Sequence, residues 1–231
     1  MNTNINKKIG IIDGMGAFAG ARFLQLFLEK VIENRLPFPE ILFNAISIDD
    51  FIVDDTKVEP AFQVISKRLE NFNQQQVSIV VMACNTAHIM HPRLQAFSTA
   101  PFPSIIDAVS QKARQLGLER VGILASPLTI KTHLYESSLE KNGLMPIIPT
   151  EAFQKILERI IRLVIDNKIT SDDKQELNKL TQLFINSNRL DAIVLGCTEL
   201  PLAFDKTSFK NTTILDSLDI LGDTLIDHLK C

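Results

Sequence analysis

The stretch VSIVVMACNTAHIMH, residues 77–91, indicates how the chain is built. Its first half is a run of β-branched and apolar residues, typical of a strand buried on both faces. The run stops at Cys84, Asn85 and Thr86, which are short and polar. Open α/β sheets bind ligands outside the carboxyl ends of their strands, so this position predicts a ligand site. The Cys84 thiol is its first candidate for chemistry, although a single buried cysteine is commonly just a small apolar residue.

Similar apolar runs recur along the chain and alternate with helical patterns. The strand-like runs cover residues 8–13, 41–48, 77–83, 103–107, 119–126, 145–149, 189–196 and 212–216. Apolar residues with a helical period cover residues 18–34, 58–72, 110–116, 130–142, 151–165, 172–184 and 217–229. Strands that are apolar on both faces and alternate with helices predict an α/β fold with parallel sheets.

The first strand and the cysteine-bearing strand each have a second copy. KIGII at 8–12 matches RVGIL at 120–124, and SIVVMAC at 78–84 matches DAIVLGC at 191–197. The spacing from the glycine to the cysteine is nearly equal in the two copies. We therefore expect a duplicated architecture in which Cys197 is the counterpart of Cys84. If the two halves face each other, the two thiols flank one ligand from opposite sides.

Composition excludes several classes of protein. The 231-residue chain has 45% hydrophobic and 22% charged residues, a formal charge of -3 and a pI near 5.8. We expect no nucleic-acid partner and no membrane partner, because both would favour a basic face. The polar N-terminus MNTNINKK lacks the apolar core of a signal peptide. Three widely spaced cysteines then indicate reduced thiols in the cytoplasm.

Two opposed thiols suit one kind of chemistry. A cysteine acts as a base only as the thiolate, and the N-terminus of a helix lowers its pKa. The segment from Asn85 to His88 has the composition of such a helix start, and GCTELP at 196–201 repeats the design. One base on each face of a carbon can remove a proton from one side and return it on the other. This logic predicts racemisation or epimerisation that needs no cofactor and no metal.

Three segments then resemble a known family. IGIIDGMG (9–16), MACNTAH (82–88) and LGCTELPL (195–202) resemble the signature segments of the aspartate/glutamate racemase superfamily, whose members do not use pyridoxal phosphate. ASPLTI (125–130) and ILDSLDIL (214–221) extend the similarity along the chain. The resemblance implies two similar α/β lobes related by pseudo-two-fold symmetry, with the active site in the cleft between them. It also implies a homodimer that interconverts the L and D enantiomers of an amino acid.

The resemblance also suggests lobe boundaries and site residues. Residues 1–103 with 213–231 would form the first lobe, to which the C-terminal helix returns, and residues 104–212 the second. Cys84 and Cys197 would be the two catalytic acid/bases, supported by Asp13 and Glu199. The expected substrate-binding residues are Met15, Gly16, Asn85, Thr86, Ala87, Thr129 and Thr198.

Departures from the family pattern concern the substrate side chain. The first motif contains Asp13 where the aspartate racemase branch has glycine, which is similar to the glutamate racemase branch. Asp49 and Asp50 stand where an arginine is common, and Ile165 lies near the position of a common lysine. Two acids beside the side chain would disfavour a dicarboxylate substrate. The cations that could compensate from elsewhere are Arg22, Lys57 and Arg93.

Other interpretations of the same residues stay open. Cys84, His88 and His91 have the spacing of zinc ligands on a helix, but no fourth ligand is evident. GMGAFAG (14–20) is similar to a dinucleotide-binding loop, with its last spacing one residue too long. Within the resembling superfamily, hydantoin racemases and maleate isomerases share the scaffold, and decarboxylases have one cysteine replaced. A silent binding protein on this fold is the remaining alternative.

Overall fold

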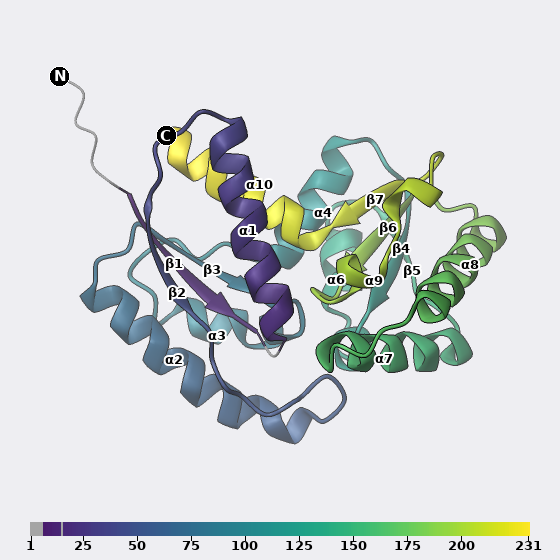
Figure 1. Cartoon of the computed structure of the whole chain (residues 1–231), viewed down its shortest axis with the longest axis horizontal. Helices are drawn as coiled ribbons and strands as arrows, with labels where there is room; N and C mark the ends of the chain where they lie inside the picture. The colour runs from purple at the N-terminus through teal and green to yellow at the C-terminus, as the bar shows by residue number, and fades with distance from the viewer. Residues whose placement is uncertain (1–6, 15) are drawn as a thin grey trace.

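The computed structural model describes residues 7–14 and 16–231, so the expected substrate-binding residue Met15 lies outside the described residues (Figure 1). The strands are β1 (Lys8–Asp13), β2 (Glu40–Asn44), β3 (Ile79–Ala83), β4 (Arg120–Ala125), β5 (Met145–Ile147), β6 (Ala192–Gly196) and β7 (Thr213–Asp216). The α-helices are α1 (Ala17–Glu33), α2 (Val58–Gln74), α3 (His91–Gln95), α4 (Ile105–Gln115), α5 (Pro127–Lys131), α6 (Leu134–Lys141), α7 (Glu151–Ile165), α8 (Ser171–Asn188), α9 (Leu200–Ala203) and α10 (Ser217–Lys230). The 3-10 helices are η1 (Asp55–Lys57), η2 (Thr86–Met90) and η3 (Lys206–Ser208).

The strands form two parallel sheets of matching topology. The first sheet has the order β2-β1-β3 and the second has the order β5-β4-β6-β7. The matched glycines lie in equivalent strands, since Gly10 pairs with Val80 of β3 and Gly122 pairs with Ile193 of β6. The predicted two-lobe α/β fold and its duplication are therefore confirmed.

A shared core joins the two lobes. Alternate residues of β1 face opposite ways: Ile9 and Ile11 lie in a buried cluster with α1, whereas Ile12 lies in a second cluster with α2. The first of these clusters also contains Val121 and Ile123 of β4. Strands that contribute to clusters on both faces explain the continuous apolar runs in the sequence.

The C-terminal helix α10 packs against α1 of the first lobe and against α4 of the second. It lies beside α1, as Figure 1 shows, and a Cβ atom on Gly222 would meet Leu26 and Lys30 of α1 at 3.0 Å. The strand before it, β7, instead pairs with β6 of the second sheet. A lobe boundary at residue 213 would split that sheet, so we propose that the crossing to the first lobe follows Asp216.

Two local predictions were wrong for identifiable reasons. Residues 103–107 are not a strand, because the Ser104 hydroxyl accepts a hydrogen bond from the Asp107 amide and so starts α4. The second strand stops at Asn44, well before residue 48, and the chain then leaves the sheet. No helix in the described part of the chain has the length and apolar composition required to cross a membrane.

Candidate active site

Both candidate cysteines lie at the carboxyl ends of equivalent strands. Cys84 directly follows β3 and is 4% exposed, and Cys197 directly follows β6 and is 3% exposed. The two groups interact electrostatically, since Cys84 is among the groups that raise the pKa of Cys197. The duplicated halves therefore place the two thiols within electrostatic range of each other.

Hydroxyl groups join the loops that follow β3 and β4. The Thr86 hydroxyl lies 2.9 Å from the Ser126 hydroxyl, and the Thr129 hydroxyl donates to Thr86 at 3.2 Å. Ser126 also lies 2.9 Å from Thr129, and all three side chains are buried. Thr86 and Thr129, both expected to bind substrate, thus meet across the two lobes. Ala87 is buried beside them within the first-lobe core.

A second buried network is centred on Asn85. Its amide nitrogen donates to the Ser217 hydroxyl at 2.9 Å, and its oxygen accepts from the Tyr135 hydroxyl at 2.6 Å. Ser217 in turn donates to the carbonyl of Leu195 in β6 at 2.9 Å. The hydrogen bonds of Ser126, Tyr135 and Ser217 to the expected site residues were not foreseen. A signal existed, because all three fall in or beside the segments that extend the family resemblance.

Glu199 holds the second cysteine. The Cys197 thiol donates to Glu199 Oε2 at 3.0 Å, and the Thr198 hydroxyl donates to the same oxygen at 3.1 Å. Burial, reinforced by the charge of Glu199, raises the pKa of Cys197 well above its ordinary value. Burial also raises the pKa of Glu199. The expectation that this site lowers the thiol pKa was therefore wrong for Cys197, which rests as a thiol beside an acceptor.

The glycines of residues 14–20 make room for these groups. A Cβ atom on Gly14 would lie 2.9 Å from the sulfur of Cys84, and one on Gly16 would lie 2.1 Å from a carboxyl oxygen of Glu199. A Cβ atom on Gly20 would lie 2.0 Å from the carboxyl carbon of Asp13. One glycine-rich segment thus contacts both halves of the site. The packing of the site's own side chains accounts for the pattern without a dinucleotide.

Asp13 is a buried acid at the end of β1. Its side chain is 2% exposed and accepts a hydrogen bond from the Gly14 amide at 2.7 Å. Burial raises the pKa of Asp13 to about 7, against the lowering effect of that amide, and the charge of Glu199 adds to the rise. Asp13 therefore titrates near neutral pH, where an acid can exchange protons with its surroundings.

The two histidines near Cys84 form hydrogen bonds with backbone groups. His88 Nε2 accepts from the Ile105 amide at 3.1 Å, so Nδ1 carries the proton and donates to the Cys84 carbonyl at 2.7 Å. Burial lowers the pKa of His88 to about 3, which keeps the ring neutral. His91 Nε2 lies 2.7 Å from the Phe102 carbonyl. With both nitrogens of His88 engaged, the ring has none to offer a metal.

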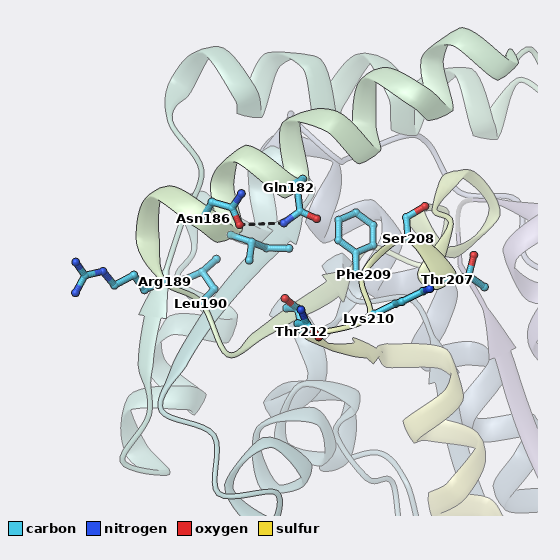
Figure 2. Close-up of a pocket in the computed structure, with 11 residues that line it drawn as sticks. Gln182, Asn186, Arg189, Leu190, Thr207, Ser208, Phe209, Lys210 and Thr212 are labelled. Atoms are coloured by element: carbon cyan, nitrogen blue, oxygen red, sulfur yellow. Dashed lines mark hydrogen bonds between the residues drawn. The ribbon is translucent and has the colours of Figure 1, made fainter.

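A cavity of about 600 Å³ lies elsewhere, between the end of α8 and the loop before β7 (Figure 2). Its lining includes Leu190 and Thr212, which precede β6 and β7 and so mark the amino ends of those strands. Figure 2 shows the Arg189 side chain pointing away from the other labelled residues. Cys197 lies at the opposite end of β6, so this cavity is separate from the cysteine site.

Comparison with known proteins finds related glutamate racemases. A glutamate racemase of Shewanella sp. (strain MR-4) is 29% identical over 160 residues, which cover 66% of this chain and 55% of that protein. A glutamate racemase of Syntrophus aciditrophicus is 24% identical over 233 residues, which cover 96% of this chain and 80% of that protein.

Solved structures share the fold. An aspartate racemase homologue from Pyrococcus horikoshii OT3 superposes with a TM-score of 0.83 at 25% identity, over 97% of this chain and 100% of that chain. A Francisella tularensis glutamate racemase in complex with D-glutamate has a TM-score of 0.76 at 19% identity, over 97% of this chain and 81% of that one. The Asp/Glu/Hydantoin racemase family matches residues 12–223. Racemases are isomerases, and the chain belongs to this racemase family, as its motifs predicted.

Proposed function

We propose that this chain is a cofactor-independent amino-acid racemase that moves a proton at Cα between two cysteines. The observation that carries the proposal is the pairing of Cys84 and Cys197 at equivalent strand ends, within electrostatic reach of one another. The named activities of the related glutamate racemases support the same reaction class.

In this mechanism each cysteine works on one face of the substrate. One cysteine removes the Cα proton as a thiolate, and the other donates a proton to the opposite face of the planar intermediate. Amide N–H groups in the two cysteine loops would stabilise the negative charge that the substrate carboxylate gains in that intermediate. The enantiomer bound determines which cysteine acts as the base.

In this scheme Glu199 accepts and returns the Cys197 proton, so that Cys197 can change between thiol and thiolate. When Cys197 donates to the intermediate, its thiol is already protonated, in keeping with its raised pKa. When Cys197 must act as the base, its proton passes to the Glu199 oxygen 3.0 Å away. The raised pKa of Glu199 makes that carboxylate a better proton acceptor than an exposed glutamate. Glu199 is thus a positioning and proton-holding residue in this scheme.

The test is loss of the Cα proton signal in deuterated water. Purified protein without added cofactor is incubated with L- and D-amino acids, including aspartate and glutamate, and with the variants Cys84→Ser and Cys197→Ser. Each variant should lose racemisation by at least about 100-fold, the lower end of what a general acid or base contributes. One-sided exchange of a single enantiomer in one variant would support the two-base scheme directly.

Cys231→Ser is the matched control, because this third cysteine is exposed at the C-terminus. It should keep full activity. Unimpaired racemisation in both directions by Cys84→Ser would disprove the two-base scheme. No Cα exchange across the panel, with both thiols reduced, would favour another substrate class on the same scaffold, such as a hydantoin or maleate.

A further inference from the structure

The side chain that follows the first cysteine is held by two buried partners. Asn85 comes directly after Cys84 in the chain. Its oxygen accepts from the Tyr135 hydroxyl at 2.6 Å, and its amide nitrogen donates to the Ser217 hydroxyl at 2.9 Å. Asn85 is 1% exposed and both partners are 0% exposed, so solvent does not reach these hydrogen bonds. The loop after Cys84 is therefore fixed by Tyr135 of α6 and Ser217 of α10.

Both partners also contact the strand that leads to Cys197. Ser217 donates its hydroxyl proton to the Leu195 carbonyl of β6 at 2.9 Å. A Cβ atom on Gly196 would lie 2.7 Å from Cε2 of Tyr135, so the tyrosine ring packs on the residue that precedes Cys197. Two separate side chains thus connect the residue after one cysteine with the two residues before the other.

We name this network the asparagine clamp; its members are Tyr135, Asn85, Ser217 and the Leu195 carbonyl. Its hydrogen bonds run in one direction. Ser217 has a single hydroxyl proton and donates it to Leu195, so it must accept from Asn85. The amide nitrogen of Asn85 therefore faces Ser217, and its oxygen faces the Tyr135 hydroxyl. Rotation of the amide by half a turn would break the bond to Ser217, so the clamp holds Asn85 in one orientation.

The clamp keeps its form while the thiols change protonation. Burial raises the pKa of Tyr135 above its ordinary value, and the Cys197 thiol is among the groups that add to the rise. Tyr135 consequently stays a neutral donor across the range in which cysteines titrate. The Asn85 amide and the Ser217 hydroxyl do not titrate there either.

The two-cysteine chemistry needs such a fixed geometry. Cys84 and Cys197 belong to different lobes, so their separation depends on how the lobes are held together. Each thiol must reach the same Cα from its own face, and a displacement of about 1 Å can cost about 100-fold in rate. The clamp joins the two cysteine loops through hydrogen bonds and packing that are fully buried.

We propose that the asparagine clamp positions the two cysteines: Tyr135 and Ser217 act through Asn85 to fix the separation that proton transfer needs. This inference rests on the proposed two-cysteine function and adds two positioning residues to it. Neither side chain touches the reacting atoms in this assignment. Their removal should therefore slow proton transfer more than it weakens substrate binding.

The test compares Tyr135→Phe and Ser217→Ala with the wild type. The substrate is the amino acid that the wild type racemises fastest among those tested for Cα exchange. Tyr135→Phe keeps the ring on Gly196 and removes only the hydroxyl. Each variant should lower kcat about tenfold or more in both directions and change KM by less than about threefold. Because both residues act through Asn85, the double variant Y135F/S217A should lose much less than the product of the two single losses.

Ser138→Ala is the matched control. It removes another buried hydrogen bond of α6, from Ser138 to Asp107 of α4 at 2.7 Å, which does not join the cysteine loops. It should leave kcat within about twofold of the wild type. Circular dichroism confirms that each variant is folded.

Three results would contradict the clamp while the racemase proposal stands. They are an unchanged kcat in folded Tyr135→Phe or Ser217→Ala, a loss confined to KM, and an equal loss of kcat in Ser138→Ala. Absence of Cα exchange by the wild type with every amino acid would instead overturn the racemase function, and the clamp with it.

Discussion

At the scale of single residues, Asp13 shows how burial in the site disfavours the charged form of a side chain. Its carboxyl group is buried, and only the Gly14 amide is seen to donate to it among the described residues. An ionised carboxylate in such a place costs folding free energy, which is why the pKa of Asp13 rises to about 7. Its neighbours Glu199 and Cys197 have raised pKa values for the same main reason, burial.

This arrangement predicts a pH-dependent stability that belongs to Asp13. Between about pH 4 and pH 7 the folded protein keeps the Asp13 proton while the unfolded chain has lost it. The unfolded state then binds fewer protons, so the stability that Asp13 contributes falls as pH rises through this window. Urea unfolding of the wild type and of Asp13→Asn should diverge with pH, with the wild type losing up to about 4 kcal/mol relative to the variant.

Two features of the pH series make this prediction specific. The difference between the two proteins should level off above about pH 8, where Asp13 is ionised in both states. Asp13→Asn keeps the shape of the side chain, so a wild type and variant that respond identically to pH would show that the Asp13 carboxyl group ionises normally in the fold.

At the scale of the element, the start of α1 is shaped by the same acid. Gly20 sits in the second turn of α1, where glycine costs about 1 kcal/mol relative to alanine if nothing else matters. Here a Cβ atom would lie 2.0 to 2.3 Å from the carboxyl atoms of Asp13. The glycine is therefore required by the close approach of a buried side chain.

Gly20→Ala should consequently destabilise the protein by about 1 kcal/mol or more, in the range of overpacked cores, despite the better helix propensity of alanine. The double variant D13A/G20A should recover most of that loss, since the added methyl group then has space. Ala21→Gly, at an exposed position of α1, serves as the control that changes propensity alone. Chemical unfolding of the set measures these differences, and a stabilised Gly20→Ala would refute the steric explanation.

Elements were the part of the fold that sequence patterns predicted best. The boundaries of α7 and β1 agree with those predicted from the apolar periodicity. Burial on one or both faces of an element requires apolar residues at a regular spacing, which is visible in the local sequence. Residues 103–107 were misassigned because a short apolar run fits a strand and a helix equally, and the cap at Ser104 decides between them.

The site was predictable where a local motif repeats and not where distant segments meet. Cys84 and Cys197 could be paired because each ends a matching strand. The Asn85–Ser217 and Asp50–Arg162 contacts join residues far apart in sequence. The sequence around one residue of such a pair does not predict the other residue. The pKa of Cys197 likewise depends on a burial that the sequence does not display.

At the scale of the whole molecule, the two lobes share one interior. A single buried cluster contains Ile9 of β1, Val121 of β4 and Leu221 of α10, so neither sheet completes its core alone. The Asn85 network adds buried hydrogen bonds between the lobes, and its partner Tyr135 is the one tyrosine of the chain. Because the sequence has no tryptophan, Tyr135 is a natural optical probe of the region where the lobes join.

The last prediction uses that probe to ask whether the lobes separate before they unfold. Burial raises the pKa of Tyr135 far above the ordinary tyrosine value of about 10. The folded pKa exceeds the unfolded one, so Tyr135 favours folding below about pH 10, and this contribution declines as pH rises further. Phenolate absorbance should therefore develop only together with the loss of helical circular dichroism during alkaline titration. Phenolate formation near the ordinary pKa, with the circular dichroism intact, would mean that the lobes part while each stays folded. Tyr135→Phe, which leaves the Asn85 oxygen without its 2.6 Å donor, should lower the unfolding free energy by about 1 to 3 kcal/mol, measured by urea unfolding at neutral pH and followed by circular dichroism.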